Sequence, residues 1–443
     1  MNKNSGGVFR RFKDDADGGI TVLTVTTFLL MFVSAGMAVD FMRHEAFRAE
    51  LQDALDRGVL AAASATQTID EELTVREFMR TSNFIPDDVL LDVQQEHTSG
   101  RRDVSATAGY TFRTYFLKLV GIPTLNVNVK SAAIEEIDKL EISLVLDISG
   151  SMRHDGRIGN LRTASKEFVT DVLGHSASSN FINLVPYAGH VNPGPTLFTA
   201  LGGVRDHNDS SCIEFDATDF ATTSLLTGNH AQVPHFHYWP TAPATMDWGW
   251  CPSDNTSIAV ANNVASELHL AIDNIRLHDG TGTMNGLKYG LGLLDPASQS
   301  LFSTLVTANE VSDEFVGGPV AWHKDKSQKV IVLMTDGKIT DQLRPDDAND
   351  AENATVHLLD NKPTYKYSTQ PDNVQTFSDL CTLAKANGVI VFTIAFEAPA
   401  DAQTQMENCA TSTSHYFEAY GTGLSDAFAA ISFTLQKLKL VSS

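Results

Sequence analysis

A run of twenty residues without a charged side chain, from Ile20 to Val39, restricts this 443-residue chain more than any other feature. A helix over this run, at about 1.5 Å per residue, is about 30 Å long, which matches the hydrocarbon thickness of a bilayer. We therefore predict a transmembrane helix over residues 20–39 and a cytoplasmic tail over residues 1–19. The alternative is a cleavable signal peptide, with Val33-Ser34-Ala35 as a candidate cleavage site. Because the helical pattern continues beyond the run, we favour an anchor that stays in place.

Basic residues flank the run and indicate its orientation. Four precede it and three follow it: Lys3, Arg10, Arg11 and Lys13, then Arg43, Arg48 and Arg57. Positive charge tends to stay on the cytoplasmic side of a membrane, so this small excess predicts an amino terminus inside the cell. The bulk of the chain would then lie outside it.

The rest of the composition is that of an acidic, globular protein. Apolar residues make up 42% of the chain, which is enough for sizeable cores, and 54 acidic against 32 basic residues give a net charge of −22. A surface that binds nucleic acid needs a basic face for the phosphates, so we expect no nucleic acid as a partner. At roughly 150 residues per domain, the length suits two or three domains.

Two patterns divide the remaining sequence. Over residues 40–68, apolar side chains recur at steps of three and four, which predicts a stalk helix, and alternating segments then predict a small α+β region up to residue 137. From residue 140 to 440, short apolar runs alternate with helical stripes, which is typical of an α/β fold with a doubly wound, mostly parallel sheet. We expect residues 188–255 and 338–370, which break this alternation, to be loop insertions.

The clearest chemical signal directly follows the apolar run Leu140–Leu146. The loop Asp147-Ile148-Ser149-Gly150-Ser151 supplies one carboxylate and two hydroxyls, and Thr335-Asp336-Gly337 follows the run Val330–Met334 in the same way. In an open α/β sheet, ligands bind beyond the carboxyl ends of the strands, so we expect these side chains to meet. Hard oxygen ligands from separate strand ends suit Mg²⁺.

Two catalytic interpretations of this loop fit less well. A phosphoryl-transfer aspartate of the dehalogenase type would need a second Asp where Ser149 stands, and a serine-hydrolase elbow would need GxSxG. The motif contains no His, Lys or Cys that could act as a base or nucleophile. We therefore predict that the protein is not an enzyme, with a metal-assisted phosphohydrolase as the less favoured alternative.

A third interpretation comes from a resemblance. Residues 140–440 resemble a von Willebrand factor A (VWA) domain with a metal-ion-dependent adhesion site, whose pattern is DxSxS, then a Thr in a Gly-rich loop, then an Asp at a later strand end. The resemblance implies five metal ligands: Asp147, Ser149, Ser151, Thr281 and Asp336. Thr281 is chosen because Gly286-Leu287 follows five residues later, and Thr283 is the alternative. Mg²⁺ is the implied ion, with Mn²⁺ or Ca²⁺ as alternatives, and a carboxylate from an Asp or Glu of a protein partner would complete its shell.

The amino-terminal part resembles a second family. Asp17-Gly18-Gly19-Ile20, the apolar run, Ala38-Val39-Asp40 and the stretch from Leu51 to Ala63 are similar to the TadE/TadG-like segment of Flp (tight adherence, Tad) pilus-assembly proteins. The combined resemblance, to a TadG-like chain, implies a protein-binding module of pilus assembly or adhesion. It would be anchored in the bacterial inner membrane with its bulk in the periplasm, and pilus or Tad machinery subunits are the implied partners. The alternative is a structural envelope or pilus component without a metal-dependent ligand.

The four cysteines form two local pairs. Cys212 and Cys251 flank one loop-like region, and Cys381 and Cys409 flank one helix–strand unit. Both pairs are disulfide candidates that suit an oxidising space outside the inner membrane, and four buried thiols are the alternative. His235 and His237 form an HxH pair beside aromatic residues, where we expect a packed aromatic loop rather than a transition-metal site.

Overall fold

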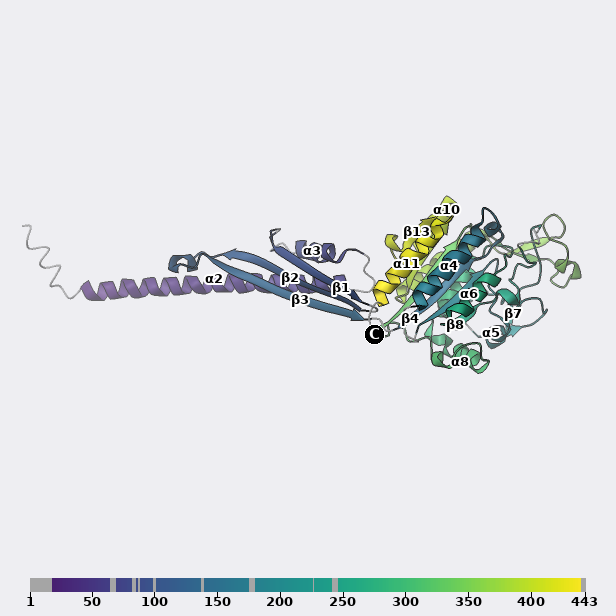
Figure 1. Cartoon of the computed structure of the whole chain (residues 1–443), viewed down its shortest axis with the longest axis horizontal. Helices are drawn as coiled ribbons and strands as arrows, with labels where there is room; N and C mark the ends of the chain where they lie inside the picture. The colour runs from purple at the N-terminus through teal and green to yellow at the C-terminus, as the bar shows by residue number, and fades with distance from the viewer. Residues whose placement is uncertain are drawn as a thin grey trace, which may run out of the picture. The chain divides into compact units, whose positions relative to one another are not determined.

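The computed structural model describes residues 18–63, 69–81, 85–86, 88–98, 101–136, 139–174, 180–225, 227–240 and 246–439. The chain divides into two compact units (Figure 1). The first comprises Met1–Glu96 and Arg102–Ile134, and the second comprises His97–Arg101 and Glu135–Ser443.

The first unit is built on one long helix, α2 (Gly18–Ala63). This single helix covers the predicted membrane segment and most of the predicted stalk, and among the described residues it alone is long and apolar enough to cross a membrane. A shorter helix, α3 (Glu71–Arg80), begins after Asp70, whose carboxylate accepts a hydrogen bond from the backbone N–H of Leu73 at 3.0 Å. Such a cap satisfies one of the free N–H groups at a helix start.

A three-stranded sheet completes this unit. Its strands lie in the order β1 (Leu90–Thr98), β2 (Arg101–Arg113) and β3 (Thr124–Glu136), and a 3-10 turn, η1 (Leu117–Val120), connects the last two. Leu51, Leu55 and Val59 of α2 are fully buried at four-residue steps, which place them on one helix face. They form a core with apolar residues of α3 and the strands: Val75, Met79, Val104, Ala106, Ala108, Val127 and Val129.

The second unit contains a six-stranded sheet in the order β13-β12-β9-β4-β5-β8. The strands are β4 (Lys139–Asp147), β5 (Phe181–Tyr187), β8 (Ala259–Asn262), β9 (Ser327–Thr335), β12 (Ile390–Phe396) and β13 (Tyr416–Ala419). Neighbouring strands from β13 to β5 are parallel, and β8 is antiparallel to β5. The predicted α/β class with a mostly parallel sheet is confirmed, and the four apolar runs form β4, β5, β9 and β12.

Two groups of helices pack beside this sheet. In the first, α4 (Arg157–Leu173) lies between α6 (Ala265–Asn274) and α11 (Gly423–Lys439) (Figure 1), and the rings of Phe168 and Phe428 are 5.5 Å apart. The second contains α7 (Thr283–Gly292), α8 (Gln299–Thr307), α9 (Gln370–Ala386) and α10 (Ala400–Cys409). Every residue of α7 is buried, and a Cβ on Gly290 would come within 2.7 Å of Val145 Cγ2, so this glycine lets the helix lie directly on β4.

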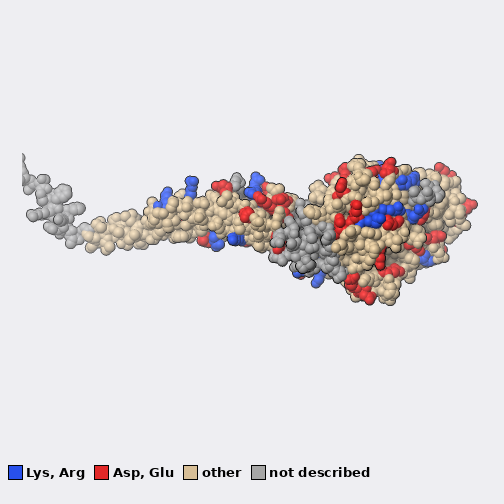
Figure 2. Space-filling view, in the orientation of Figure 1, with Lys and Arg blue, Asp and Glu red and all other residues tan. Residues whose placement is uncertain are grey.

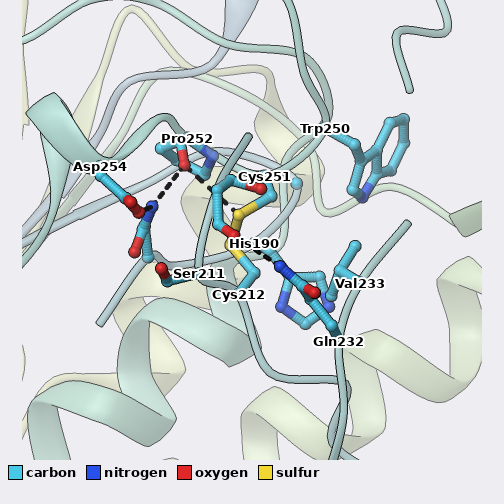
Figure 3. Close-up of a disulfide and its surroundings, with 12 residues drawn as sticks. His190, Ser211, Cys212, Gln232, Val233, Trp250, Cys251, Pro252 and Asp254 are labelled. Carbon is cyan, nitrogen blue, oxygen red and sulfur yellow. Dashed lines mark hydrogen bonds between the residues drawn. A yellow bond between two sulfur atoms is a disulfide. The ribbon is translucent and has the colours of Figure 1, made fainter. Parts of the chain in front are cut away.

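The two stretches that break the alternation contain short elements. Residues 188–255 include α5 (Pro195–Ala200) and a two-stranded ribbon of β6 (Gly203–Val204) and β7 (His230–Ala231), and residues 338–370 include β10 (Gln342–Pro345) paired with β11 (Thr364–Ser368). Cys212 and Cys251 form a buried disulfide inside the first stretch, with Val233 beside it (Figure 3). Cys381 of α9 forms a second disulfide with Cys409 at the end of α10.

The Cys381–Cys409 disulfide is expected to stabilise the second unit. It closes a sequence separation of 28 residues, and in the chain-entropy model such a loop is worth about 3.5 kcal/mol. We expect the double variant Cys381→Ala, Cys409→Ala to lose about that much free energy of unfolding. Denaturant unfolding followed by tryptophan fluorescence measures it, because all four tryptophans lie in this unit: Trp239, Trp248, Trp250 and Trp322. Equal midpoints for the two chains would contradict the prediction.

Candidate metal centre

Acidic side chains lie at the carboxyl ends of three neighbouring parallel strands. Asp147 is the last residue of β4, Asp336 follows β9, and Glu397 follows β12. The strands pair in the order β12-β9-β4, so their carboxyl ends form one edge of the sheet. This is the edge at which open α/β sheets bind ligands.

Hydrogen bonds connect the DxSxS loop to Asp336. The backbone N–H of Ser149 donates to Asp147 Oδ1 at 2.8 Å, and the hydroxyl oxygens of Ser149 and Ser151 are 3.0 Å apart. The Ser151 hydroxyl donates to Asp336 Oδ1 at 2.6 Å, across a sequence separation of 185 residues. The fold therefore brings together four of the five residues that the sequence singled out as ligands.

The surroundings of Gly337 locate the two candidate threonines. A Cβ on Gly337 would lie 3.6 Å from Ser151 Oγ and 4.0 Å from Thr281 Oγ1, so both hydroxyls lie beside the residue that follows Asp336. Thr283, in contrast, is the first residue of α7, and its hydroxyl lies near the buried phenol of Tyr187. Thr281 is therefore the threonine that lies with the DxSxS loop and Asp336.

The two carboxylates oppose each other's ionisation. Asp147 and Asp336 are no more than 3% exposed. Burial, and then the negative charge of Asp336, raise the pKa of Asp147 to about 7, although hydrogen bonds from Ser149 and Thr335 favour its charged form. Burial also raises the pKa of Asp336, against the lowering effect of Ser151 and Arg157. A bound cation would remove this penalty.

The donor set fits a hard divalent cation. Two carboxylates and three hydroxyls gather at one edge, and all of these ligands are oxygens, as Mg²⁺ requires. Among the described residues, no group of three or more His, Cys, Asp and Glu side chains could hold a metal. The oxygens gathered at this edge therefore include serine and threonine hydroxyls, which the DxSxS pattern provides in part.

Sequence reasoning missed a fixed cation beside this group. Arg157 donates from Nη1 to Asp336 Oδ2 at 2.7 Å and from Nε to Glu397 Oε2 at 3.0 Å. Arg157 is the first residue of α4, where a positive charge opposes the helix dipole. That unfavourable position is the one signal in the sequence that could have indicated a carboxylate partner. Arg157 thus binds one carboxylate oxygen of Asp336, Oδ2. The other oxygen, Oδ1, faces Ser151.

The HxH pair belongs to a packed aromatic loop, as expected. His237 is fully buried, and its Nδ1 accepts a hydrogen bond from the backbone N–H of Gly249 at 3.1 Å. Its ring lies 4.9 Å from that of Trp248, and the neighbouring Phe236 stacks on Trp250 at 5.4 Å. The aromatic residues of this stretch therefore pack against one another and form a small core beneath the loops.

The comparisons with known proteins bear first on the amino terminus. Residues 18–65 match the model of a family described as putative Flp pilus-assembly TadE/G-like. The chain carries a TadE/G-like segment. This match confirms the resemblance proposed for the amino-terminal residues. A search of curated proteins gave no match.

Several solved structures resemble the chain. The vWF domain of the type V pili tip protein Mfa5 from Porphyromonas gingivalis is 15% identical at a TM-score of 0.39, over 69% of this chain and 98% of that one. The pilus adhesin SpaC from Lactobacillus rhamnosus GG is 12% identical at a TM-score of 0.36, over 79% of this chain and 34% of the adhesin. Proximal thread matrix protein 1 from the mussel byssus is 13% identical at a TM-score of 0.32, over 68% of this chain. The match spans 47% of that protein, about half its length.

Without a bound ion, the raised pKa of Asp147 predicts a loss of stability as the pH rises. The folded chain keeps this proton up to about pH 7, whereas the unfolded chain releases it near pH 4, so the folded state binds more protons between these values. In EDTA, we expect the melting temperature of the wild type to fall between pH 5 and 8 relative to that of Asp147→Asn, which cannot ionise. Thermal melts of both chains across this range measure the difference.

A matched control separates this effect from general charge removal. Asp346 is exposed in the residue 338–370 stretch, so Asp346→Asn removes one negative charge at a position without that burial. Its melting curve should follow that of the wild type at every pH. If the Asp147→Asn and wild-type curves also run parallel, Asp147 does not carry a raised pKa.

Proposed function

We propose that this chain is a membrane-anchored, periplasmic, metal-dependent protein-binding module of Flp pilus assembly or adhesion. In this proposal the second unit is a VWA-type domain with a doubly wound sheet. Mg²⁺, or alternatively Mn²⁺ or Ca²⁺, is held by five residues: Asp147, Ser149, Ser151, Thr281 and Asp336. The observation that carries the proposal is the meeting of two mutually repelling, buried carboxylates with these hydroxyls at the carboxyl edge of the sheet.

The chemistry of the edge favours binding over catalysis. Two carboxylates balance the charge of a divalent cation, and a position that they leave open accepts water or a carboxylate from another protein. Two of the neighbouring side chains are poor general bases, because Arg157 stays protonated and burial raises the pKa of Tyr187, and Glu397 is already paired with Arg157. We therefore propose that an Asp or Glu of a pilus or Tad machinery subunit completes the metal shell.

Two observations support the proposed location. The TadE/G-like match over residues 18–65 covers the whole of α2, whose first part is the uncharged run, and this fits an anchor in the inner membrane. Both cysteine pairs are disulfides in the structure, which suits an oxidising space such as the periplasm. The orientation with the amino terminus inside places the second unit in that space.

A structural role is the second candidate, and Arg157 favours it. Its guanidinium already neutralises one oxygen of Asp336 and binds Glu397 as well. The edge could therefore fold around these ion pairs, with the domain acting only through packing in the pilus or envelope.

Metal binding should stabilise the folded second unit. A ligand that binds only the folded state at 100 times its Kd adds about 2.7 kcal/mol. We expect Mg²⁺ to raise the melting temperature of the EDTA-treated chain, and Asp147→Ala to abolish this increase. Thr281→Val should weaken it, whereas Thr283→Val should retain it, because Thr283 lies by Tyr187. Melting temperatures during a Mg²⁺ titration test all four chains, and an unchanged wild-type value would refute the metal site.

A functional test in cells separates the two candidates. If a partner carboxylate binds the metal, cells that carry Asp147→Ala should lose pilus assembly or adhesion while keeping normal levels of the protein. The control Asp346→Ala removes an exposed acid away from this edge and should have no effect. Electron microscopy and surface binding of the cells provide the measurement. Normal pili with Asp147→Ala would favour the structural role.

A further inference from the structure

The turn that connects β2 to β3 lies against the apolar run of α2. The rings of Phe116 and Phe32 are 6.1 Å apart in an edge-on arrangement. Gly36 provides the space for this contact, since a Cβ at that position would come within 2.3 Å of the Phe116 ring. Both Phe32 and Gly36 belong to the uncharged run Ile20–Val39. An element of the first unit therefore reaches the height of the predicted membrane segment.

Asp40 holds the turn at that height. Its carboxylate is fully buried and accepts hydrogen bonds from the consecutive backbone N–H groups of Tyr115, Phe116 and Leu117 at 3.0, 2.6 and 2.8 Å. Burial alone would raise the pKa of Asp40, but these N–H groups and the nearby Arg43 lower it below its usual value. The carboxylate is thus charged at neutral pH, and charge-assisted hydrogen bonds connect the turn to α2.

The turn presents apolar side chains outward. Four of them are between 43% and 64% exposed: Tyr115, Leu119, Val120 and Ile122. They are neighbours in sequence, and exposed apolar groups that gather in this way mark a contact surface. The adjoining part of α2 exposes apolar side chains as well, including Phe28 and Phe32. Figure 2 shows this part of the helix without a charged side chain on the visible face.

The charged and aromatic residues around the turn are of the types that are enriched at membrane interfaces. The guanidinium of Arg43 lies over the ring of Tyr115 at 4.3 Å. Tyrosine is enriched at the level of lipid headgroups, and basic side chains can extend toward the headgroups from an apolar surface. Lys118, which is exposed between apolar neighbours, is placed for the same interaction.

We propose that the turn Tyr115–Ile122 is a second membrane-contacting element, which inserts into the periplasmic interface of the bilayer that α2 crosses. Phe116 contacts residues that precede Asp40 by four and eight positions, or about 6–12 Å along the helix. At that height the bilayer surrounds a membrane-spanning helix, and the exposed side chains of the turn are apolar, so we assign lipid as the occupant. The proposal rests on α2 as an anchor and is independent of the metal site.

Site-directed spin labelling of the full chain tests the insertion. All four native cysteines are in disulfides, so one introduced cysteine is a unique labelling site. The test variant is Leu119→Cys, the lipid reference is Val25→Cys on α2, and the water reference is Leu73→Cys. Leu73 is an exposed apolar residue of α3, and α3 packs by Val75 against Gly58, about 27 Å along α2 from Asp40.

Each labelled chain is reconstituted into vesicles of phosphatidylethanolamine and phosphatidylglycerol. Collision of the nitroxide with lipid-soluble oxygen is compared with its collision with a water-soluble nickel complex. We expect the label at position 119 to favour oxygen, as the label at position 25 does, and the label at position 73 to favour nickel. Adding Gly36→Leu, which displaces Phe116, should shift the label at position 119 toward nickel and leave position 73 unchanged.

Three results would overturn the proposal in different ways. A label at position 119 that matches position 73, while position 25 stays in lipid, means that the anchor stands but the turn does not insert. Water exposure at position 25 means that α2 does not span the bilayer and that the anchor itself is wrong. Protection of position 119 from both reagents, with spin–spin broadening, means that a second copy of the chain covers the turn instead of lipid.

Discussion

Backbone pairing forces two acidic side chains together at the carboxyl edge of the large sheet. In the register of β4 with β9, Leu146 lies opposite Met334, so Asp147 emerges beside Thr335 and Asp336. The Thr335 hydroxyl donates to Asp147 Oδ2 at 2.7 Å, which shows how closely these strand ends meet. Burial keeps water from screening the two charges, and their repulsion must be relieved by a proton or a cation. Other polar groups at this edge, including Ser151 and Arg157, contact these carboxylates.

Arg157 relieves only part of the repulsion. One guanidinium serves both Asp336 and Glu397, so with Asp147 ionised three carboxylates and one fixed positive charge leave two negative charges at the edge. That remainder is the charge of one divalent cation. The hydrogen bonds are arranged consistently, because Arg157 binds one oxygen of Asp336 and Ser151 lies at the other. The structural ion pair and the proposed metal site would therefore share the same aspartate without competing for the same oxygen.

The parts of this fold that were predictable from the sequence are those with local causes. β4, β5, β9 and β12 were predictable because strands buried on both faces are continuous apolar runs. The DxSxS loop was recognisable because its three polar residues lie within one five-residue segment. The spacing to Gly286-Leu287 favoured Thr281 over Thr283, but only the fold shows which hydroxyl lies beside Gly337. The position of Arg157 at a helix start hints at a carboxylate partner, but Glu397 lies 240 residues away, so no local pattern could identify it.

Two of the buried aspartates, Asp40 and Asp147, have surroundings that deal with a buried negative charge in opposite ways. Three backbone N–H groups surround Asp40, and its pKa is lowered despite burial, so its charge is already compensated by the protein. Asp147 receives one backbone N–H and faces a second carboxylate, and its pKa is raised to about 7. A compensated carboxylate needs nothing more and serves to fix structure. An uncompensated one is stable only with a proton or a bound cation, and this difference is the physical reason to assign binding to Asp147 and anchoring to Asp40.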